Sequence, residues 1–142
     1  MKINIKKLTN EAVTPRYATK GASGFDLHCI EDLLIAPGAT VLARTGLAID
    51  VGDGYEMQVR PRSGLSLKTS LRVANSPGTV DSDYRGEVCV IVWNSGLTEL
   101  KISKGDRIAQ GVICPVIQAD IVVTEYLDDT DRGAGGFGST GK

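Results

Sequence analysis

Short stretches in which apolar and polar residues alternate constrain the fold of this chain more than any other feature. YEMQVR at 55–60 has this period of two, which is typical of a strand with one buried and one solvent-exposed face. Residues 3–5 and 100–102 show the same alternation. EVCVIVW at 87–93 is a continuous apolar run, which suits a strand covered on both faces. Glycine and proline separate these segments. Many short strands with turns between them predict an all-β chain, such as a sandwich, jelly roll or barrel.

Helical periodicity is almost absent. No long segment has an apolar stripe of period 3.6, so we expect at most one short helix, within SLKTSL at 66–71. The composition changes only after Leu127, where DDTDRGAGGFGSTGK loses almost every apolar side chain. We therefore predict one domain over 1–127 and a flexible, glycine-rich C-terminal arm over 128–142, which cannot join the core by itself.

Charge and cysteine content narrow the classes of function. The net charge of −1 argues against a surface that coats nucleic acid, and no apolar run reaches the length of a membrane span. The opening MKINIKK lacks the apolar segment of a signal peptide, so we expect a cytoplasmic protein with neither a nucleic-acid nor a membrane partner. The three cysteines form no C-x-x-C pair, which predicts neither zinc nor a disulfide framework. His28 has no second histidine, and we expect it to be inert.

The arm contains two apparent nucleotide-binding motifs. GFGSTGK at 136–142 fits G-x-x-x-x-G-K, and GAGGFG at 133–138 fits G-x-G-x-x-G. Both motifs bind phosphate partly through a following helix, for which this sequence provides no residues, so we reject both. A flexible linker is the simpler interpretation, although Arg132 and Phe137 are unusual within such a linker.

Three other stretches concentrate charge, glycine and hydroxyl groups. RPRSGLS at 60–66 could present a guanidinium, a hydroxyl and backbone N–H groups to an anion, or could simply end a strand in a turn. KGDRIAQG at 104–111 is expected to be a turn into a strand, where the Gln110 amide could meet a ligand.

The third stretch, ANSPGTVDSDYRGEV at 74–88, predicts a hairpin turning at Pro77–Gly78. On an extended chain, Asp81 and Asp83 would share one face and Ser82 and Tyr84 the other. Either acid could be a general base for water, or both could merely form the turn.

Taken in order, these stretches resemble the five motifs of the trimeric deoxyuridine triphosphatase (dUTPase) family. The matching segments are ASGFDL at 22–27, RSGLS at 62–66, GTVDSDYRGEV at 78–88, GDRIAQ at 105–110 and RGAGGFGSTG at 132–141. Thr79, where an aliphatic residue is frequent, and His28, after the first motif, are small departures.

The resemblance implies a distorted jelly-roll or β-sandwich homotrimer with shared active sites. Such an enzyme hydrolyses dUTP to dUMP and pyrophosphate with Mg²⁺, which removes dUTP and supplies dUMP. The arm of one subunit would close over a neighbour's site.

Roles follow residue by residue from the same resemblance. Asp81 would activate the attacking water, and Asp26 would anchor hydrated Mg²⁺, held mainly by the substrate phosphates. The phosphates would be gripped by Arg62, Ser63, Gly64 and Gln110. Uracil would be read by Asn75, Gly78, Thr79, Val80 and the backbone of Cys89, and deoxyribose by Tyr84. From the arm, Phe137 would stack on uracil while phosphate contacts come from Arg132, Gly138, Ser139 and Thr140.

Two alternatives stay open. One is a dCTP deaminase-like relative on the same fold, which needs a differently placed acid–base glutamate, and Glu87 is the only glutamate near the turn. The other is a regulatory trimer that kept the fold without the activity.

Overall fold

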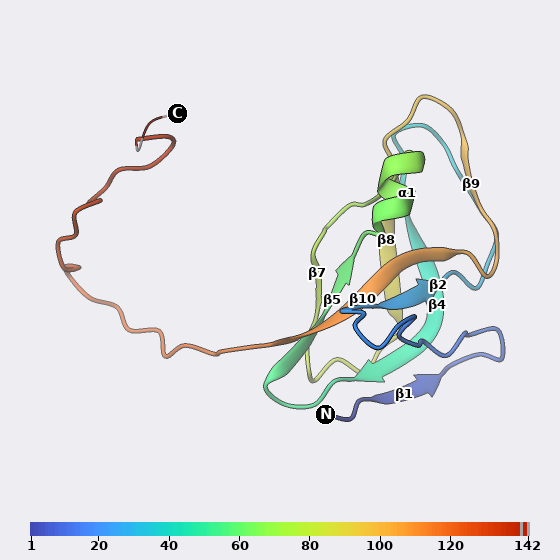
Figure 1. The fold of residues 1–142 in the computed structure, drawn as a ribbon, viewed down its shortest axis with the longest axis horizontal. Helices are drawn as coiled ribbons and strands as arrows, with labels where there is room; N and C mark the ends of the chain where they lie inside the picture. Colours follow the sequence, from blue (N-terminus) through green and yellow to red (C-terminus); the bar gives the residue numbers. More distant parts are fainter. Residues whose placement is uncertain (140, 142) are drawn as a thin grey trace.

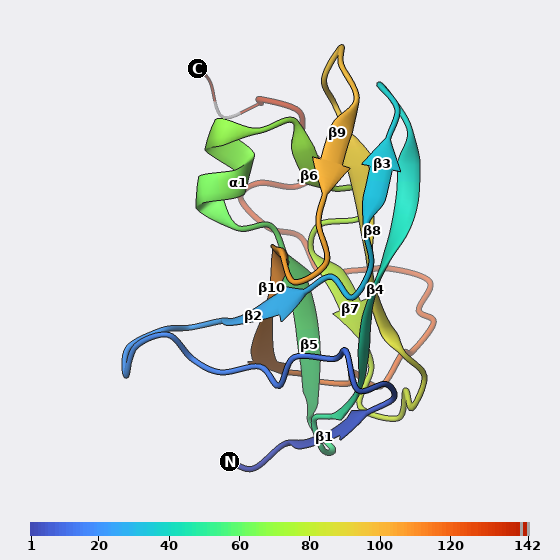
Figure 2. The ribbon, with the colours of Figure 1, turned by 90° about the vertical axis from the view of Figure 1, so that its right-hand side faces the viewer.

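Two antiparallel sheets form the body of the fold (Figures 1 and 2), and their apolar side chains meet in one core. The computed structural model describes residues 1–139 and 141. The first sheet has the order β1 (Asn4–Lys7), β4 (Thr40–Asp50), β8 (Val88–Asn94), β6 (Leu71–Val73). The second has the order β2 (Phe25–His28), β10 (Arg107–Pro115), β5 (Tyr55–Arg60), β7 (Gly78–Val80). A small third sheet pairs β3 (Leu33–Ile35) with β9 (Leu100–Ile102).

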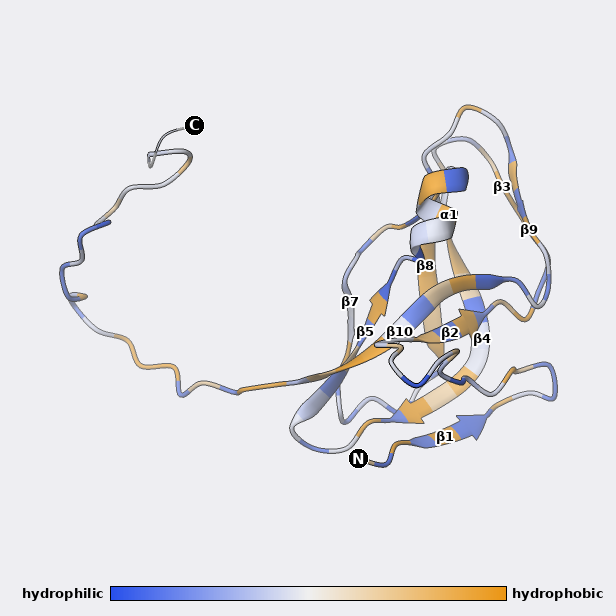
Figure 3. Cartoon of the chain, in the orientation of Figure 1, coloured by the Kyte–Doolittle hydropathy of each residue, from blue (hydrophilic) through white to orange (hydrophobic). Residues whose placement is uncertain are grey.

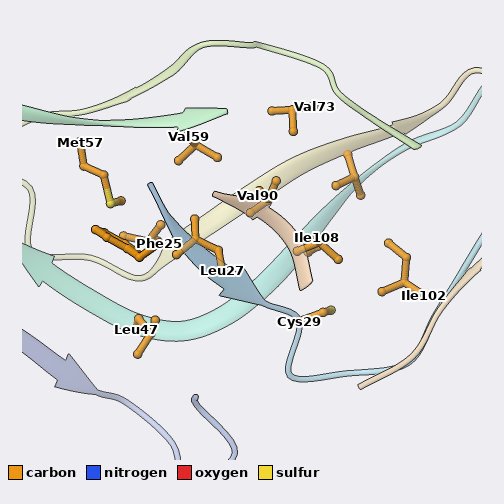
Figure 4. Close-up of a cluster of buried hydrophobic side chains, with 14 of the residues drawn as sticks. Phe25, Leu27, Cys29, Leu47, Met57, Val59, Val73, Val90, Ile102 and Ile108 are labelled. Carbon is orange, nitrogen blue, oxygen red and sulfur yellow. The ribbon is translucent and has the colours of Figure 1, made fainter. Parts of the chain in front are cut away.

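The core lies between the two larger sheets (Figure 4). Leu27 and Met57 from the second sheet and Val90 from the first are fully buried there. The predicted alternation explains this for β5, in which Met57 and Val59 face inward. The all-β sandwich with a jelly-roll-like arrangement is confirmed.

Strand β8 is covered on one face only within this chain, so the prediction of a strand buried on both faces is wrong here. Val88, Val90 and Val92 point into the core, whereas Ile91 and Trp93 are 37% and 40% exposed. The apolar run therefore supplies an inner face and an uncovered apolar outer face.

The helix begins earlier than expected. Among the described residues the structure has one helix, α1 (Ser63–Lys68), and not one spanning 66–71. Thr69 ends it by taking an extended conformation (φ −137°, ψ 171°), while its hydroxyl and its backbone N–H both donate to the Leu65 carbonyl, at 2.7 and 2.9 Å. The stretch RSGLS is thus the start of a helix, which replaces the alternative of a simple turn at the end of a strand.

The predicted hairpin at Pro77–Gly78 is wrong. The strands before and after it lie in different sheets, because β6 pairs with β8 and β7 pairs with β5. The turn therefore carries the chain from one sheet to the other. Packing of both strands on the common core overrides the local turn signal.

After β10 the chain extends away from the sandwich (Figure 1), and no strand follows among the described residues. Its first part carries apolar side chains (Figure 3), of which Ile121 and Val123 are 94% and 96% exposed. The boundary between residues 127 and 128 stays a prediction. In the part of the chain that the structure describes, no helix is long and apolar enough to cross a membrane.

Candidate functional site

A hollow of about 320 Å³ beside β7 brings together most of the residues expected to read a base and a sugar. Its walls include Val59 of β5 and Leu42 of β4. The predicted site residues that line it are Asn75, Gly78, Thr79, Val80, Asp81, Tyr84 and Cys89. The predicted base-reading, sugar-reading and catalytic positions therefore share one cavity.

The pairing of β7 with β5 positions this hollow. Gly78 lies opposite Val59, and Val80 lies opposite Met57. A Cβ atom on Gly78 would lie 2.9 Å from Nδ2 of Asn75, closer than real side chains approach. Glycine at 78 therefore lets the Asn75 amide lie directly against the strand, at the mouth of the hollow.

Asp81 and Tyr84 lie on the same hollow, contrary to the expectation of opposite faces. Residues 81–84 form a turn, in which the Tyr84 N–H donates to the Asp81 carbonyl at 3.2 Å. Asp83 instead lines a separate, larger hollow of about 710 Å³, to which Asp81 also contributes. The turn thus distinguishes the two acids, which the alternation pattern alone left equivalent and only the resemblance to the family separated.

A second group of predicted residues surrounds Asp26. Arg62 Nε lies 2.7 Å from Oδ1 of Asp26, and Arg107 Nη1 lies 3.2 Å from Oδ2. Nη1 of Arg62 also donates to the Arg107 carbonyl at 3.1 Å. Gln110 Nε2 donates to the Pro61 carbonyl at 3.0 Å, which ties β10 to the start of α1. Ser63 and Gly64 follow Arg62 as the first residues of that helix.

Sequence reasoning missed Arg107. It belongs to the matched GDRIAQ segment, but only the register of β2 on β10 shows that it meets the carboxylate of Asp26. Both oxygens of that carboxylate are engaged by guanidinium groups, which makes this a compact and mostly cationic cluster.

The two groups lie apart within one chain. Arg62 pairs with Asp26 and does not line the hollow, although Val59, three residues earlier, does. One chain therefore does not place Arg62 against the Asp81 hollow.

The predicted arm residues lie away from both groups. Phe137 is fully exposed, and Arg132 Nε donates to the nearby Gly135 carbonyl, at 2.9 Å. Gly138 and Ser139 lie on the same extended segment, and Thr140 lies outside the described residues. Over the described part of the arm beyond Val116, no hydrogen bond or ion pair reaches the sandwich.

The cysteines and the histidine show no sign of reactive or metal chemistry. Burial, and next the charge of Glu87, raise the pKa of Cys89, so its thiol stays protonated at neutral pH. Burial likewise lowers the pKa of His28 and favours the neutral ring. All three cysteines are free, and residues 1–139 and 141 contain no group of three or more metal-ligating side chains.

Comparison with known proteins decides the family. The dUTPase family model matches residues 10–141. The chain belongs to the dUTPase family. A deoxyuridine 5'-triphosphate nucleotidohydrolase from Nautilia profundicola is 58% identical over 142 residues, with 100% of both chains covered. The resemblance drawn from the five motifs is thereby confirmed.

Solved structures of the family agree with the fold. The dUTPase of Staphylococcus bacteriophage 80alpha with dUpNHpp is 26% identical, with a TM-score of 0.93 and 99% of each chain covered. A dUTPase variant from phage phi11 of S. aureus, 21% identical with a TM-score of 0.86, covers 91% of this chain and 100% of its own. That phage protein coordinates a structural Mg(II) ion.

The Asp26 cluster generates a stability prediction. Asp26→Asn should lower the free energy of unfolding by roughly 1–3 kcal/mol, because two guanidinium groups lose a charged acceptor. Denaturant unfolding at a fixed protein concentration measures this. Glu11→Gln, which removes an exposed ion pair with Lys104, is the matched control and should change stability by about 0–1 kcal/mol. Equal stability of Asp26→Asn and the unaltered protein would contradict the prediction.

Proposed function

We propose that this chain hydrolyses dUTP to dUMP and pyrophosphate, removing dUTP and supplying dUMP in the cytoplasm. The observation that carries the proposal is the hollow beside β7, where Asp81, Tyr84 and Asn75 lie together on a chain of the dUTPase family. The bound dUpNHpp of the 80alpha enzyme supports a deoxyuridine triphosphate as the substrate class.

Base selection is assigned to the segment from Asn75 to Val80. Uracil offers an N3–H donor between two carbonyls, whereas cytosine presents an acceptor beside an amino donor. The Asn75 amide and the backbone of β7 and Cys89 match uracil and would leave the groups of cytosine unpaired. The close approach of Asn75 to Gly78 leaves little room for the 5-methyl group of thymine.

Sugar selection is assigned to Tyr84. Its ring, 44% exposed at the hollow, would lie against the deoxyribose and exclude a 2′-hydroxyl by contact. Selection then needs the ring held in place, because a ring free to move would admit ribose.

Asp81 is assigned the role of general base. Water oxygen bonds to the α-phosphorus in line with the leaving group, and a water proton passes to an Asp81 carboxylate oxygen. The bond from the α-phosphorus to the bridging oxygen breaks, which releases pyrophosphate. Positioning and charge neutralisation dominate such reactions, so one carboxylate at the hollow suffices for proton transfer.

Mg²⁺ fits this site as an ion brought by the substrate. The described residues include no metal-ligating cluster, and both oxygens of Asp26 already accept from guanidinium groups. These residues suit an ion held mainly by phosphates and reached by Asp26 through water. When bound, the ion would neutralise phosphate charge. Arg62, Ser63, Gly64 and Gln110 would grip the phosphates.

A homotrimer with shared sites would complete the active site. Within one chain Arg62 pairs with Asp26 and does not line the hollow, so a second copy would supply the phosphate grip there. The outer face of the first sheet supports self-association, because Leu42, Ile91 and Trp93 form an exposed apolar surface there.

The arm over 128–142 is proposed as a lid on a neighbouring subunit. Phe137 would stack on uracil, while phosphate contacts would come from Arg132, Gly138, Ser139 and Thr140. The full exposure of Phe137 supports this, because an exposed aromatic ring is available to cover a ligand. Closure would exclude all water except the attacking molecule.

The deaminase alternative is weakened by the surroundings of Glu87. Its Oε1 accepts from the Gly46 N–H at 2.7 Å, and its Oε2 lies 3.0 Å from Arg44 Nη2. A carboxylate engaged at both oxygens does not serve as a mobile acid–base group. The regulatory trimer without activity is disfavoured by the placement of Asp81 in the hollow.

Release of pyrophosphate from dUTP, measured beside separate reactions with dCTP, dTTP and UTP, tests the function. We expect dUTP to exceed each of the others by at least about 10²-fold in kcat/KM. Equal rates on all four nucleotides would overturn the assigned specificity. Release of ammonia from dCTP would instead favour the deaminase.

Asp81→Asn should reduce kcat by roughly 10²–10⁴-fold, because the variant cannot take the proton from water. Asp83→Asn is the matched control, since Asp83 lies two residues away but does not line the smaller hollow. We expect that control to keep kcat within about threefold. Wild-type turnover by Asp81→Asn would remove Asp81 from the role of base.

Deletion of residues 132–142 tests the lid. The truncated chain should fold and assemble as the full chain does, because the sandwich forms its core without the arm, yet be nearly inactive. A mass measurement in solution and pyrophosphate release measure the two properties. Full activity after deletion would show that the arm is a simple linker.

A further inference from the structure

The position of Tyr84 depends on the two residues that follow Arg85. Its ring lies over Gly86, where an added Cβ would come within 2.5 Å of Cζ and 2.9 Å of Cε2. The Tyr84 hydroxyl donates to the Glu87 carbonyl at 3.0 Å. Glycine at 86 thus leaves room for the ring, and the backbone at Glu87 holds its far end.

The backbone at Glu87 is fixed in turn by its own side chain. Oε1 accepts from the Gly46 N–H at 2.7 Å, and Oε2 accepts from Nε of Arg44 at 3.1 Å. The Glu87 side chain is only 18% exposed, so these charge-assisted contacts are partly shielded from water. Next to it, the Thr45 hydroxyl donates to the Val88 carbonyl at 2.5 Å.

Glu87 contacts β4 at a point where the pairing of that strand is irregular. The register of β4 on β8 shifts between Arg44 and Leu47, and Gly46 has a φ of +68°. A Cβ on Gly46 would lie 3.0 Å from both the Ala12 Cβ and the Thr9 Oγ1. This bulge turns the Gly46 N–H toward Glu87, and the packing around Gly46 keeps it there.

We propose that Glu87 is a positioning residue for sugar selection. Its carboxylate locks the loop to the β4 bulge, and its carbonyl thereby holds the Tyr84 hydroxyl at one place over the hollow. Glu87 does not act on the reacting atoms, because both of its carboxylate oxygens are engaged by β4. This inference rests on the proposed function, in which Tyr84 excludes a 2′-hydroxyl.

Glu87→Ala tests the lock through the ratio of kcat/KM for dUTP to that for UTP. We expect this ratio to fall on the order of tenfold, mainly through a lower KM for UTP, because a ring freed from the lock admits a ribose while the sugar lies away from the α-phosphorus. Glu87→Gln should recover part of the ratio, since its amide oxygen can still accept from the Gly46 N–H. Glu11→Ala, which removes a distant exposed ion pair, is the control and should keep the ratio.

A double-mutant cycle separates positioning from a general loss of stability. Tyr84→Phe removes the hydroxyl through which the lock acts, so Glu87→Ala combined with Tyr84→Phe should be about as selective as Tyr84→Phe alone. Losses that add independently would overturn the proposal. If Glu87→Ala does not fold, Arg44→Met carries the same test, because it breaks the ion pair and keeps an apolar stem.

Different results would contradict the proposed function and the role of Glu87. A wild-type protein that hydrolyses neither dUTP nor UTP overturns the proposed function and this inference with it. A wild-type protein that selects dUTP, together with a folded Glu87→Ala that keeps the full ratio, overturns the inference alone.

Discussion

Burial of Met57 and Val59 fixes the register of β5, and that register positions both groups of site residues. This strand lies between β10 and β7, and Met57 and Val59 point from it into the core. Slipping it by one residue would turn both side chains to solvent, so burial fixes the register. That register places Gly78 opposite Val59 on one edge and Gln110 opposite Arg60 on the other. Both groups of site residues are therefore positioned by one buried strand.

Different interactions position the residues of the hollow and those of the cationic cluster. Backbone geometry shapes the hollow, since glycines at 46, 78 and 86 allow contacts that a Cβ would prevent. Charge holds the cluster, where Asp26 lies between Arg62 and Arg107. In the proposed trimer, a second copy would bring such a cluster to each hollow. The uncovered apolar face at Ile91 and Trp93 is consistent with assembly.

Much of the site could be predicted from the sequence because each motif is short and continuous. GTVDSDYRGEV places Asp81 and Tyr84 close together, and the structure puts both on one hollow. The face assigned to each was wrong, because a turn and not an extended strand runs through 81–84. The hairpin at Pro77–Gly78 was wrong for a related reason. Local turn residues do not specify which sheet the next strand joins.

The class of fold follows from the sequence, since alternation of period two with glycine and proline turns leaves few other solutions, and five ordered motifs indicate the family. Which distant residues meet could be seen only in the folded chain. Arg107 reaches Asp26 across the β2–β10 pair, and Glu87 reaches Arg44 and Gly46 at a bulge in β4. Such contacts join residues tens of positions apart. They depend on strand register and packing, which follow from burial of the whole core and from no local pattern.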